Sequence, residues 1–329
     1  MMSFKAVVIE KTDDVQGVGI KQFAIDDLME GDTVVRISHS SLNYKDGLAI
    51  TGASPVVRRF PMVPGIDFVG IVESTSAEGL NAGDAVLLNG WGTGERHLGG
   101  WAQKSRVPGK WLTPLPAGFT PEQAMAVGTA GYTAALCVLA LQDGGVTPDS
   151  GEIVVSGAAG GVGSVAVSLL ASLGYSVVAS TGRAEEEGYL KKLGASRVIP
   201  RDELAAAPRP LEKELWAGAV DSVGSTTLAN ILAKTKYGGT VACCGLAAGM
   251  DLPTSVAPFI LRGITLRGID SVMAPPELRA RAWELLDRTL DRSVLGEMTS
   301  VVSLEQAVEA AGDILKGKVR GRMVVKIED

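Results

Sequence analysis

Short apolar runs separated by turn residues fill the first third of the chain. Four of these runs have the length and the β-branched content of strands. They are residues 5–9, 33–37, 67–72 and 84–88. We therefore expect a largely antiparallel β domain that ends near residue 122.

From residue 123 to residue 263 the pattern changes, and strand-like runs alternate with helix-like segments. The strand-like runs are residues 153–155, 175–180, 198–200, 219–224 and 239–245. The helix-like segments include residues 162–173 and 227–235. This alternation is typical of a doubly wound parallel sheet, as in a Rossmann domain.

After residue 264 the pattern returns to that of the first third of the chain. Strand-like runs at 265–270 and 321–327 flank helix-like segments at 276–291 and 304–316. We therefore predict a discontinuous β domain made of residues 1–122 and 264–329, around a Rossmann domain at 123–263. The C-terminal strand is expected to close back onto the N-terminal strand.

A glycine-rich turn separates the run 153–155 from the helix that follows it. Gly157, Gly160 and Gly163 have three-residue spacing, which permits a tight turn, close approach to a pyrophosphate and close helix packing. The helix N-terminus would offer unpaired N–H groups and a positive dipole end to phosphates. The residues expected at the nucleotide are Gly157, Ala159, Gly160, Gly161, Val162 and Gly163. The alternative is an ordinary tight turn without a nucleotide.

The second strand of this domain ends in a sequence that favours NADPH over NADH. NAD-binding units place an acid about 20 residues after the glycines, to bind the ribose 2′-hydroxyl. Here Ser180, Thr181, Gly182 and Arg183 occupy that position. The hydroxyls can donate to a 2′-phosphate and Arg183 can pair with it, although a surface arginine can also be merely solvated.

Composition narrows the class of protein. The 329-residue chain is 46% hydrophobic and has a formal net charge of −6 with a pI near 5.2, which argues against nucleic-acid binding. No apolar run approaches the roughly 18 to 20 uncharged residues of a membrane span, and no signal peptide is evident. The three cysteines form no disulfide framework. We expect a two-domain cytoplasmic enzyme.

Longer motifs resemble those of the medium-chain dehydrogenase/reductase superfamily. Three segments resemble turns that are typical of the superfamily: residues 64–70, 83–86 and 99–103. Three others point to one branch within it: residues 41–52, 89–95 and 156–166. These strings resemble the zinc-independent acrylyl-CoA reductase branch, which is often labelled quinone oxidoreductase. The resemblance implies a GroES-like substrate domain and a homodimer.

The zinc ligands of other superfamily members are missing from this chain. Ile66 follows Gly65 in the turn that carries a histidine in zinc enzymes, and no thiol lies in residues 43–46. The only histidines are His39 and His97. We expect no metal, and therefore no alcohol dehydrogenation.

Without a metal, the resemblance implies hydride transfer to the β-carbon of an activated alkene and protonation of its α-carbon. Tyr44 is the candidate proton donor and a cofactor contact, and the Asn89 amide is a candidate donor to the developing enolate. The alternatives are a Tyr44 ring packed in a loop and a turn-forming Asn89 before Gly90.

The resemblance also suggests where substrate and cofactor contacts lie. Cations expected at the CoA phosphates are Arg58, Arg59, Arg96, Arg320 and Arg322. Further residues expected at the cofactor are Arg201, Leu246, Ile260 and Ser271. Each arginine has the alternative of a solvated surface position, and the apolar run around Ile260 could instead be core or a dimer contact.

The resulting prediction is NADPH-dependent reduction of a short 2-enoyl-CoA thioester, most specifically acryloyl-CoA to propionyl-CoA. A quinone or enone reductase would use the same hydride chemistry without cations for CoA. A non-catalytic NADPH-binding sensor is the alternative from a different class.

Overall fold

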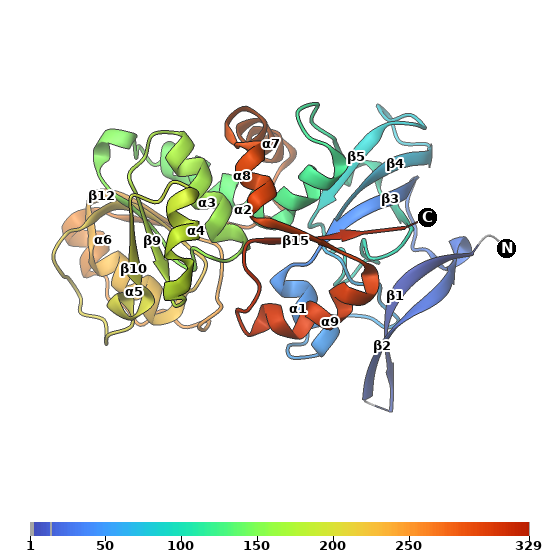
Figure 1. Cartoon of the computed structure of the whole chain (residues 1–329), viewed down its shortest axis with the longest axis horizontal. Coiled ribbons are helices and arrows are strands. Elements are labelled where there is room, and N and C mark those ends of the chain that lie inside the picture. The colour runs from blue at the N-terminus through green and yellow to red at the C-terminus, as the bar shows by residue number, and fades with distance from the viewer. Residues whose placement is uncertain (1–2, 14, 329) are drawn as a thin grey trace. The chain divides into compact units, whose positions relative to one another are not determined.

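The computed structural model describes residues 3–13 and 15–328. The chain divides into two compact units, drawn with one colour ramp in Figure 1. Unit 1 comprises Met1–Thr129 and Met298–Asp329, and unit 2 comprises Ala130–Glu297.

Unit 1 is built on a seven-stranded mixed sheet. Its order is β14-β15-β3-β4-β5-β7, with β6 also paired to β3. The strands are β3 (Thr33–Ser41), β4 (Asp67–Thr75), β5 (Ala85–Asn89), β6 (Lys104–Val107), β7 (Thr113–Pro114), β14 (Thr299–Val302) and β15 (Arg322–Lys326). The strand pairs of this sheet are antiparallel, except that β14 is parallel to β15.

The C-terminal strand does not pair with the N-terminal strand, so that expectation was wrong. β15 instead lies antiparallel to β3, as Figure 1 shows. β1 (Ser3–Thr12) is occupied by its hairpin partner β2 (Val15–Ala24) over all ten residues of each strand. A hairpin with a short connection forms from local contacts and leaves that edge of β1 unavailable.

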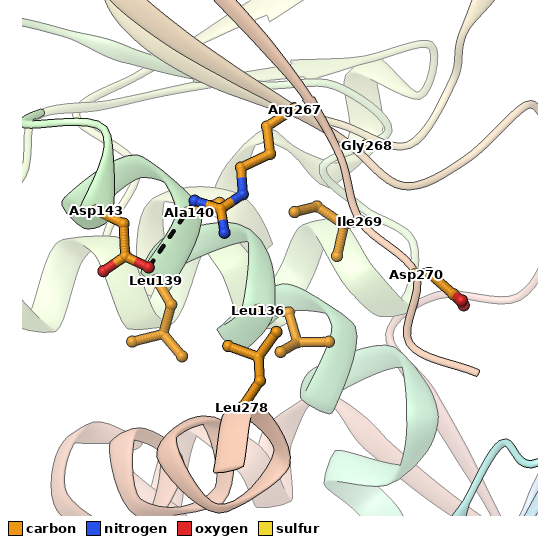
Figure 2. Close-up of a pocket in the computed structure, with 9 residues that line it drawn as sticks. All are labelled: Leu136, Leu139, Ala140, Asp143, Arg267, Gly268, Ile269, Asp270 and Leu278. Carbon is orange, nitrogen blue, oxygen red and sulfur yellow. Dashed lines mark ion pairs between the residues drawn. The ribbon is translucent and has the colours of Figure 1, made fainter. Parts of the chain in front are cut away.

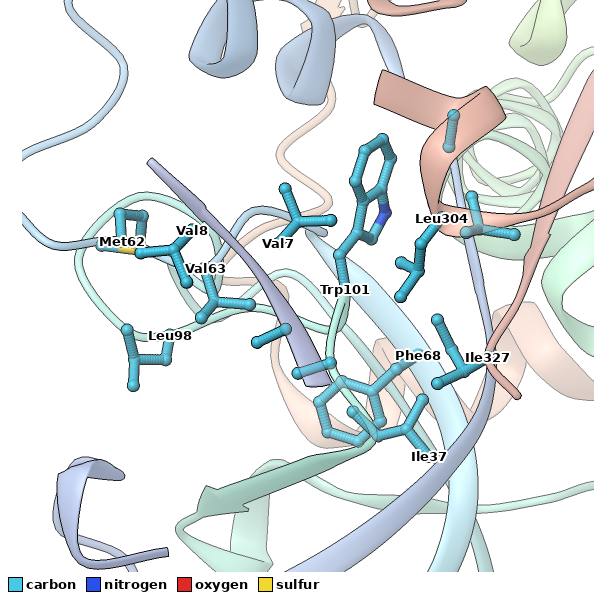
Figure 3. Packing of buried hydrophobic residues seen from close by; sticks show 14 of the residues in the cluster. Val7, Val8, Ile37, Met62, Val63, Phe68, Leu98, Trp101, Leu304 and Ile327 are labelled. Atoms are coloured by element: carbon cyan, nitrogen blue, oxygen red, sulfur yellow. The ribbon is translucent and has the colours of Figure 1, made fainter. Parts of the chain in front are cut away.

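The hydrophobic core of unit 1 is centred on Trp101 and Phe68, both 0% exposed (Figure 3). Two helices, α1 (Tyr44–Thr51) and α9 (Leu304–Leu315), contribute to it. They pack closely, since a Cβ at Gly47 would lie 2.7 Å from Ile314 Cγ2. Two 3-10 turns, η1 (Ile25–Asp27) and η2 (Gly109–Trp111), complete the unit.

Unit 2 contains a six-stranded parallel sheet. Its order is β10-β9-β8-β11-β12-β13, the strand order of a Rossmann fold. The strands are β8 (Ile153–Val155), β9 (Val177–Thr181), β10 (Arg197–Pro200), β11 (Trp216–Asp221), β12 (Thr235–Cys243) and β13 (Thr265–Gly268). The order reverses between β8 and β11, where such sheets bind ligands.

Helices connect these strands or follow the last of them. They are α3 (Gly161–Ser172), α4 (Glu187–Lys192), α5 (Ser225–Ala233), α6 (Ala257–Arg262), α7 (Pro276–Thr289) and α8 (Arg292–Glu297), with 3-10 turns η3 (Pro148–Ser150), η4 (Ala184–Glu186) and η5 (Arg201–Leu204). Residues 264–297 lie in this unit, whereas the sequence pattern placed them in the β domain. β13 extends the parallel sheet by pairing with β12, and a short strand looks alike in sequence whichever sheet it joins.

The expectation that no apolar run approaches the length of a membrane span was wrong, because the longest described helix, α2 (Pro121–Asp143), contains such a run. Among the described helices it is the one with the length and composition of a membrane span. Its apolar stretch is 94% buried within the protein, as in the core helix of a globular fold. Gly128, with φ 50° and ψ −159°, interrupts the helix.

Candidate active site

The glycine-rich turn joins β8 to α3. Gly160 is the N-cap of α3, and its N–H donates to the Gly157 carbonyl at 2.9 Å. A Cβ at Gly163 would lie 2.3 Å from the Gly157 oxygen, which is a backbone atom. Gly157 itself has φ 59°, a conformation that favours glycine. The turn and helix therefore pack too closely for a side chain at Gly163, as a phosphate-binding turn requires.

A buried acid that the sequence analysis did not select supports this turn from β11. Asp221 is 0% exposed and accepts from Ser156 Oγ at 2.6 Å and from Gly224 N at 2.8 Å. Burial raises the pKa of Asp221. Ser222 follows it and donates its N–H to Ser156 Oγ at 3.1 Å. These bonds fix the start of the turn to the neighbouring strand at the switch point of the sheet.

The end of β9 brings two arginines to the glycine-rich turn. Arg183 Nη2 donates to the carbonyl of Ala159, within the turn, at 2.9 Å. A Cβ at Gly182 would lie 2.7 Å from Arg201 Nε, so the second guanidinium lies against the end of the same strand. Arg183 Nη1 also lies 3.9 Å from Glu186 Oε1, just after the strand end. The two cations, with no acid among residues 180–183, fit the 2′-phosphate of NADPH. Ser180 is only 2% exposed, so the structure does not support its expected contact with that phosphate.

The other expected cofactor residues are more dispersed. Thr181 is 7% exposed and accepts from the Arg183 N–H at 3.1 Å. Leu246 lies near the turn after β11, because a Cβ at Gly224 would lie 3.2 Å from its Cα. Ser271 is half-buried and its carbonyl accepts from Arg279 Nη2 at 3.3 Å. Ile260 on α6 is 73% exposed. Their contacts with a cofactor, and that of the half-buried Val162 at the start of α3, stay predictions.

In unit 1, Tyr44 and Asn89 occupy different environments. Tyr44 is the first residue of α1 and is 41% exposed, so its phenol can meet a ligand. Asn89 ends β5 and is 2% exposed, and its Nδ2 donates to Thr129 Oγ1 at 3.4 Å. The roles assigned to both residues stay predictions.

A buried carboxylate, Asp67, connects the segments that carry these two residues. Its oxygens accept from Ser41 N at 3.0 Å, from Ser41 Oγ at 2.8 and 2.9 Å, from Asn43 Nδ2 at 3.1 Å and from Thr129 N at 2.7 Å. Asn43 is the N-cap of α1. Asp67 therefore anchors both the start of α1 and Thr129, the partner of Asn89.

Arg322 belongs to this buried network, so its assignment to CoA binding was wrong. The residue is 2% exposed, and burial lowers its pKa. It donates to Ala126 O at 2.8 Å, to Ser41 Oγ at 2.9 Å and to Asn43 Oδ1 at 3.4 Å. A guanidinium bonded to protein groups on the inside of unit 1 cannot also serve as a surface cation for a phosphate.

A second buried acid, Asp46, belongs to the first turn of α1 and was also missed. It is 1% exposed and accepts from the backbone N–H groups of Gly65 and Ile66 at 3.0 and 3.1 Å, and from that of Asn43 at 2.9 Å. Burial, and secondarily the Asp67 carboxylate, raise the pKa of Asp46 to about 7. Asp46 thus fixes α1 to the turn that carries a zinc ligand in metal-dependent relatives.

The other four expected substrate arginines are exposed: Arg58, Arg59, Arg96 and Arg320. The backbone joins two of these segments, since Arg58 N donates to the Glu95 carbonyl at 2.8 Å. In the same loop Trp91 has φ 56° and stacks on Trp111 with ring centroids 5.9 Å apart. This arrangement gathers the first three arginines near the loop that follows Asn89.

Within the described residues, no group of three or more His, Cys, Asp or Glu side chains could hold a metal ion. A cavity of about 70 Å³ in unit 2 lies among α2, β13 and α7 (Figure 2). Leu136, Leu139, Ile269 and Leu278 line it, and the Asp143–Arg267 ion pair spans 3.9 Å at its rim. It has room for a few water molecules and contains none of the expected site residues.

Two family models match the chain. Residues 29–117 match the alcohol dehydrogenase GroES-like domain, and residues 161–288 match the zinc-binding dehydrogenase domain. The chain is 52% identical to the probable acrylyl-CoA reductase AcuI of Escherichia coli, over 98% of this chain and 99% of that protein. It is 50% identical to acrylyl-CoA reductase AcuI of Ruegeria pomeroyi, with the same coverage.

The chain belongs to the acrylyl-CoA reductase branch of the medium-chain dehydrogenase/reductase superfamily. The expected family and fold class are confirmed.

Two solved structures share the fold over nearly the whole chain. The yhdH oxidoreductase of Salmonella enterica, crystallised with NADP, has a TM-score of 0.97 and 51% identity, covering 98% of this chain and 100% of that one. The yhfP protein of Bacillus subtilis, crystallised with NAD, has a TM-score of 0.95 and 42% identity, covering 99% and 100%. The curated name of the Bacillus relative is putative quinone oxidoreductase.

Proposed function

We propose that this protein catalyses the NADPH-dependent reduction of acryloyl-CoA to propionyl-CoA. The observation that carries the proposal is the identity of 52% and 50%, over 98% of the chain, to two proteins named acrylyl-CoA reductase. In the reaction a hydride adds to the β-carbon, a proton adds to the α-carbon, and NADP⁺ leaves. The family branch and the buried position of Asn89 agree with this chemistry.

The nucleotide part of the proposal is supported by the glycine-rich turn and the two guanidinium groups beside it. NADPH, when bound, supplies the hydride. Arg183 and Arg201 bind the 2′-phosphate, and the N–H groups at the start of α3 bind the pyrophosphate. The turn is kept in shape by the buried Asp221.

In our proposal, side chains of this protein stabilise the negative charge that develops on the substrate and supply the proton for its α-carbon. As hydride reaches the β-carbon, negative charge develops on the thioester oxygen, and a fixed donor is worth most there. The Asn89 amide is that donor in our proposal, and the exposed Tyr44 phenol delivers the proton to the α-carbon. Arg58, Arg59, Arg96 and Arg320 attract the CoA phosphates to an otherwise acidic protein.

We further propose a cytoplasmic homodimer. β13 is the last strand in the sheet order of unit 2, and the segment that connects β12 to β13 carries large apolar side chains that are exposed. They are Met250 at 88%, Val256 at 68%, Ile260 at 73% and Leu261 at 62%. A second copy of the chain would cover this patch and the strand edge. Light scattering should give twice the 34.1 kDa chain mass, and Leu261→Asp should reduce it to that of one chain.

The test of the reaction is a comparison of steady-state NADPH oxidation with acryloyl-CoA, crotonyl-CoA and a small quinone. We expect the highest kcat/KM with acryloyl-CoA. The Bacillus relative, named a putative quinone oxidoreductase, makes quinone or enone reduction the second candidate. Turnover of the quinone alone would replace our proposal with that one.

The double variant Arg58→Ala/Arg59→Ala separates the two candidates further. Its KM for acryloyl-CoA should rise about tenfold, because each surface cation contributes a fraction of a kcal/mol or more to an anion nearby. Its KM for the quinone should not change. An equal effect on both acceptors would mean that these arginines do not bind CoA.

A further inference from the structure

Gly128 interrupts α2 at the point where the helix contacts the buried hydrogen-bonded side chains of Arg322, Ser41 and Asp67. Gly128 has φ 50° and ψ −159°, which breaks the helical course of the backbone. A Cβ at this position would lie 2.4 Å from Arg322 Nη2, 2.7 Å from Ser41 Oγ and 3.1 Å from Asp67 Oδ2. The backbone therefore approaches the network as closely as only a glycine permits.

The break changes the partner of the next backbone N–H. In a continuous helix the Thr129 N–H would donate to a carbonyl four residues earlier. Here it donates to Asp67 Oδ2 at 2.7 Å. Asp67 is itself held by Ser41, which accepts from the buried Arg322. The backbone of Thr129 is therefore fixed by a buried side-chain acceptor.

Thr129 in turn contacts Asn89. Asp67 and Asn89 are directly opposite each other on the antiparallel strands β4 and β5. Such pairs place their side chains on the same face of a sheet. The Asn89 Nδ2 donates to Thr129 Oγ1 at 3.4 Å, and both side chains are buried, at 2% and 7% exposed. Asp67, Thr129 and Asn89 thus form a connected triangle.

We propose that Thr129 is a positioning residue that orients the Asn89 amide for the reaction. Its backbone is fixed by Asp67, and its hydroxyl accepts one amide N–H, which sets the rotation of the amide about its last side-chain bond. The amide then presents a defined donor to the developing oxyanion. This inference rests on the proposed function, in which Asn89 is that donor.

The test removes the hydroxyl while keeping the shape of the side chain. Thr129→Val should lower kcat with acryloyl-CoA about tenfold, because small misplacements of catalytic groups cost up to a hundredfold in rate. The KM for NADPH and the melting temperature should change little. Thr129→Ser keeps the acceptor and should restore most of kcat. Thr33→Val, a buried threonine at the far end of β3 with a bonded hydroxyl, is the matched control and should keep full kcat.

A double-mutant cycle distinguishes positioning from general disturbance. In an Asn89→Ala background, Thr129→Val should have no further effect on kcat, because the amide that it orients is gone. A tenfold loss in that background, or full activity of Thr129→Val alone, would overturn the inference.

A second readout does not depend on turnover. The side-chain amide signals of Asn89, assigned in a ¹H–¹⁵N spectrum by their loss in Asn89→Ala, should shift in Thr129→Val and keep their position in Thr129→Ser. Unchanged signals in Thr129→Val would refute the positioning role. If the wild-type protein did not reduce acryloyl-CoA, the proposed function would fail, while these signals would still decide whether Thr129 orients Asn89.

Discussion

Replacing Asp46 by Asn should change how the stability of the protein depends on pH. Asp46 is 1% exposed, and burial raises its pKa from 3.8 to about 7, with a smaller effect from Asp67. The unfolded chain exposes this carboxyl to water, where its pKa returns to the ordinary value near 3.8. Between these two values, the unfolded state loses the proton and the folded state keeps it.

The sign follows from this difference in bound protons. Because the folded state binds more protons than the unfolded state in this range, stability falls as pH rises from about 4 to about 7. At 1.36 kcal/mol for each pH unit, the full loss due to Asp46 is about 4 kcal/mol. Above about pH 7 the carboxyl is ionised in both states, and its contribution no longer changes.

Urea unfolding of the wild type and Asp46→Asn, followed by tryptophan fluorescence, measures this loss. The variant has no proton to lose, so its free energy of unfolding relative to the wild type should increase with pH. The expected increase is about 3 kcal/mol from about pH 5 to about pH 8. The variant also loses an acceptor for the Asn43 N–H, but that cost is the same at every pH. Asp149→Asn, at an exposed carboxyl in unit 2, serves as the comparison for the loss of a charge.

A difference between wild type and Asp46→Asn that stays constant over this pH range would refute the reasoning. It would mean that Asp46 is ionised in the folded protein at acidic pH. The backbone donors of Gly65 and Ile66 would then outweigh burial.

Three further outcomes are expected. Gly163→Ala should lower the free energy of unfolding by about 1–3 kcal/mol and abolish NADPH binding in calorimetry, since its Cβ would lie 2.3 Å from the Gly157 oxygen; normal binding would contradict the tight turn. Arg183→Ala should raise the KM for NADPH about tenfold and leave that for NADH unchanged, as steady-state rates would show. Arg322→Met should lower the free energy of unfolding in urea by about 3–5 kcal/mol, because the buried Asp67 and Asp46 lose the nearby positive charge. The KM for acryloyl-CoA should not change.

The parts of the fold that the sequence predicted correctly are those encoded by neighbouring residues. The run Ile153–Val155, the glycines after it and the helix from Gly161 lie within twenty residues, and their order alone specifies a strand, turn and helix. The partners of the short strands could not be read in this way. β13 and β15 are both short strands, of four and five residues, yet one extends the parallel sheet and the other pairs with β3.

The buried network of unit 1 was harder to predict because its members are far apart in sequence. Arg322 and Ser41 are 281 residues apart, and Ser41 and Asp67 are 26 apart. Arg320 and Arg322 look alike in a basic segment, but Arg320 is exposed and Arg322 begins the buried strand β15. Arg322 is buried because it meets Ser41, which is bonded to the buried Asp67. Asp67 belongs to another strand, β4, so the sequence around Arg320 and Arg322 does not show which of the two is buried.

The apolar runs nevertheless contain a signal that indicates where the buried acids lie. Asp67 begins β4 and Asp221 ends β11, and each adjoins a run of residues that are almost all buried. An ionised carboxylate is costly in such a place unless hydrogen-bond donors surround it. A carboxylate at the end of a buried strand therefore indicates that other segments converge on it with N–H and O–H groups. Here those groups come from Ser41 and Thr129 in one unit and from Ser156 and Gly224 in the other, and in both units they fix a segment that we assign to the active site.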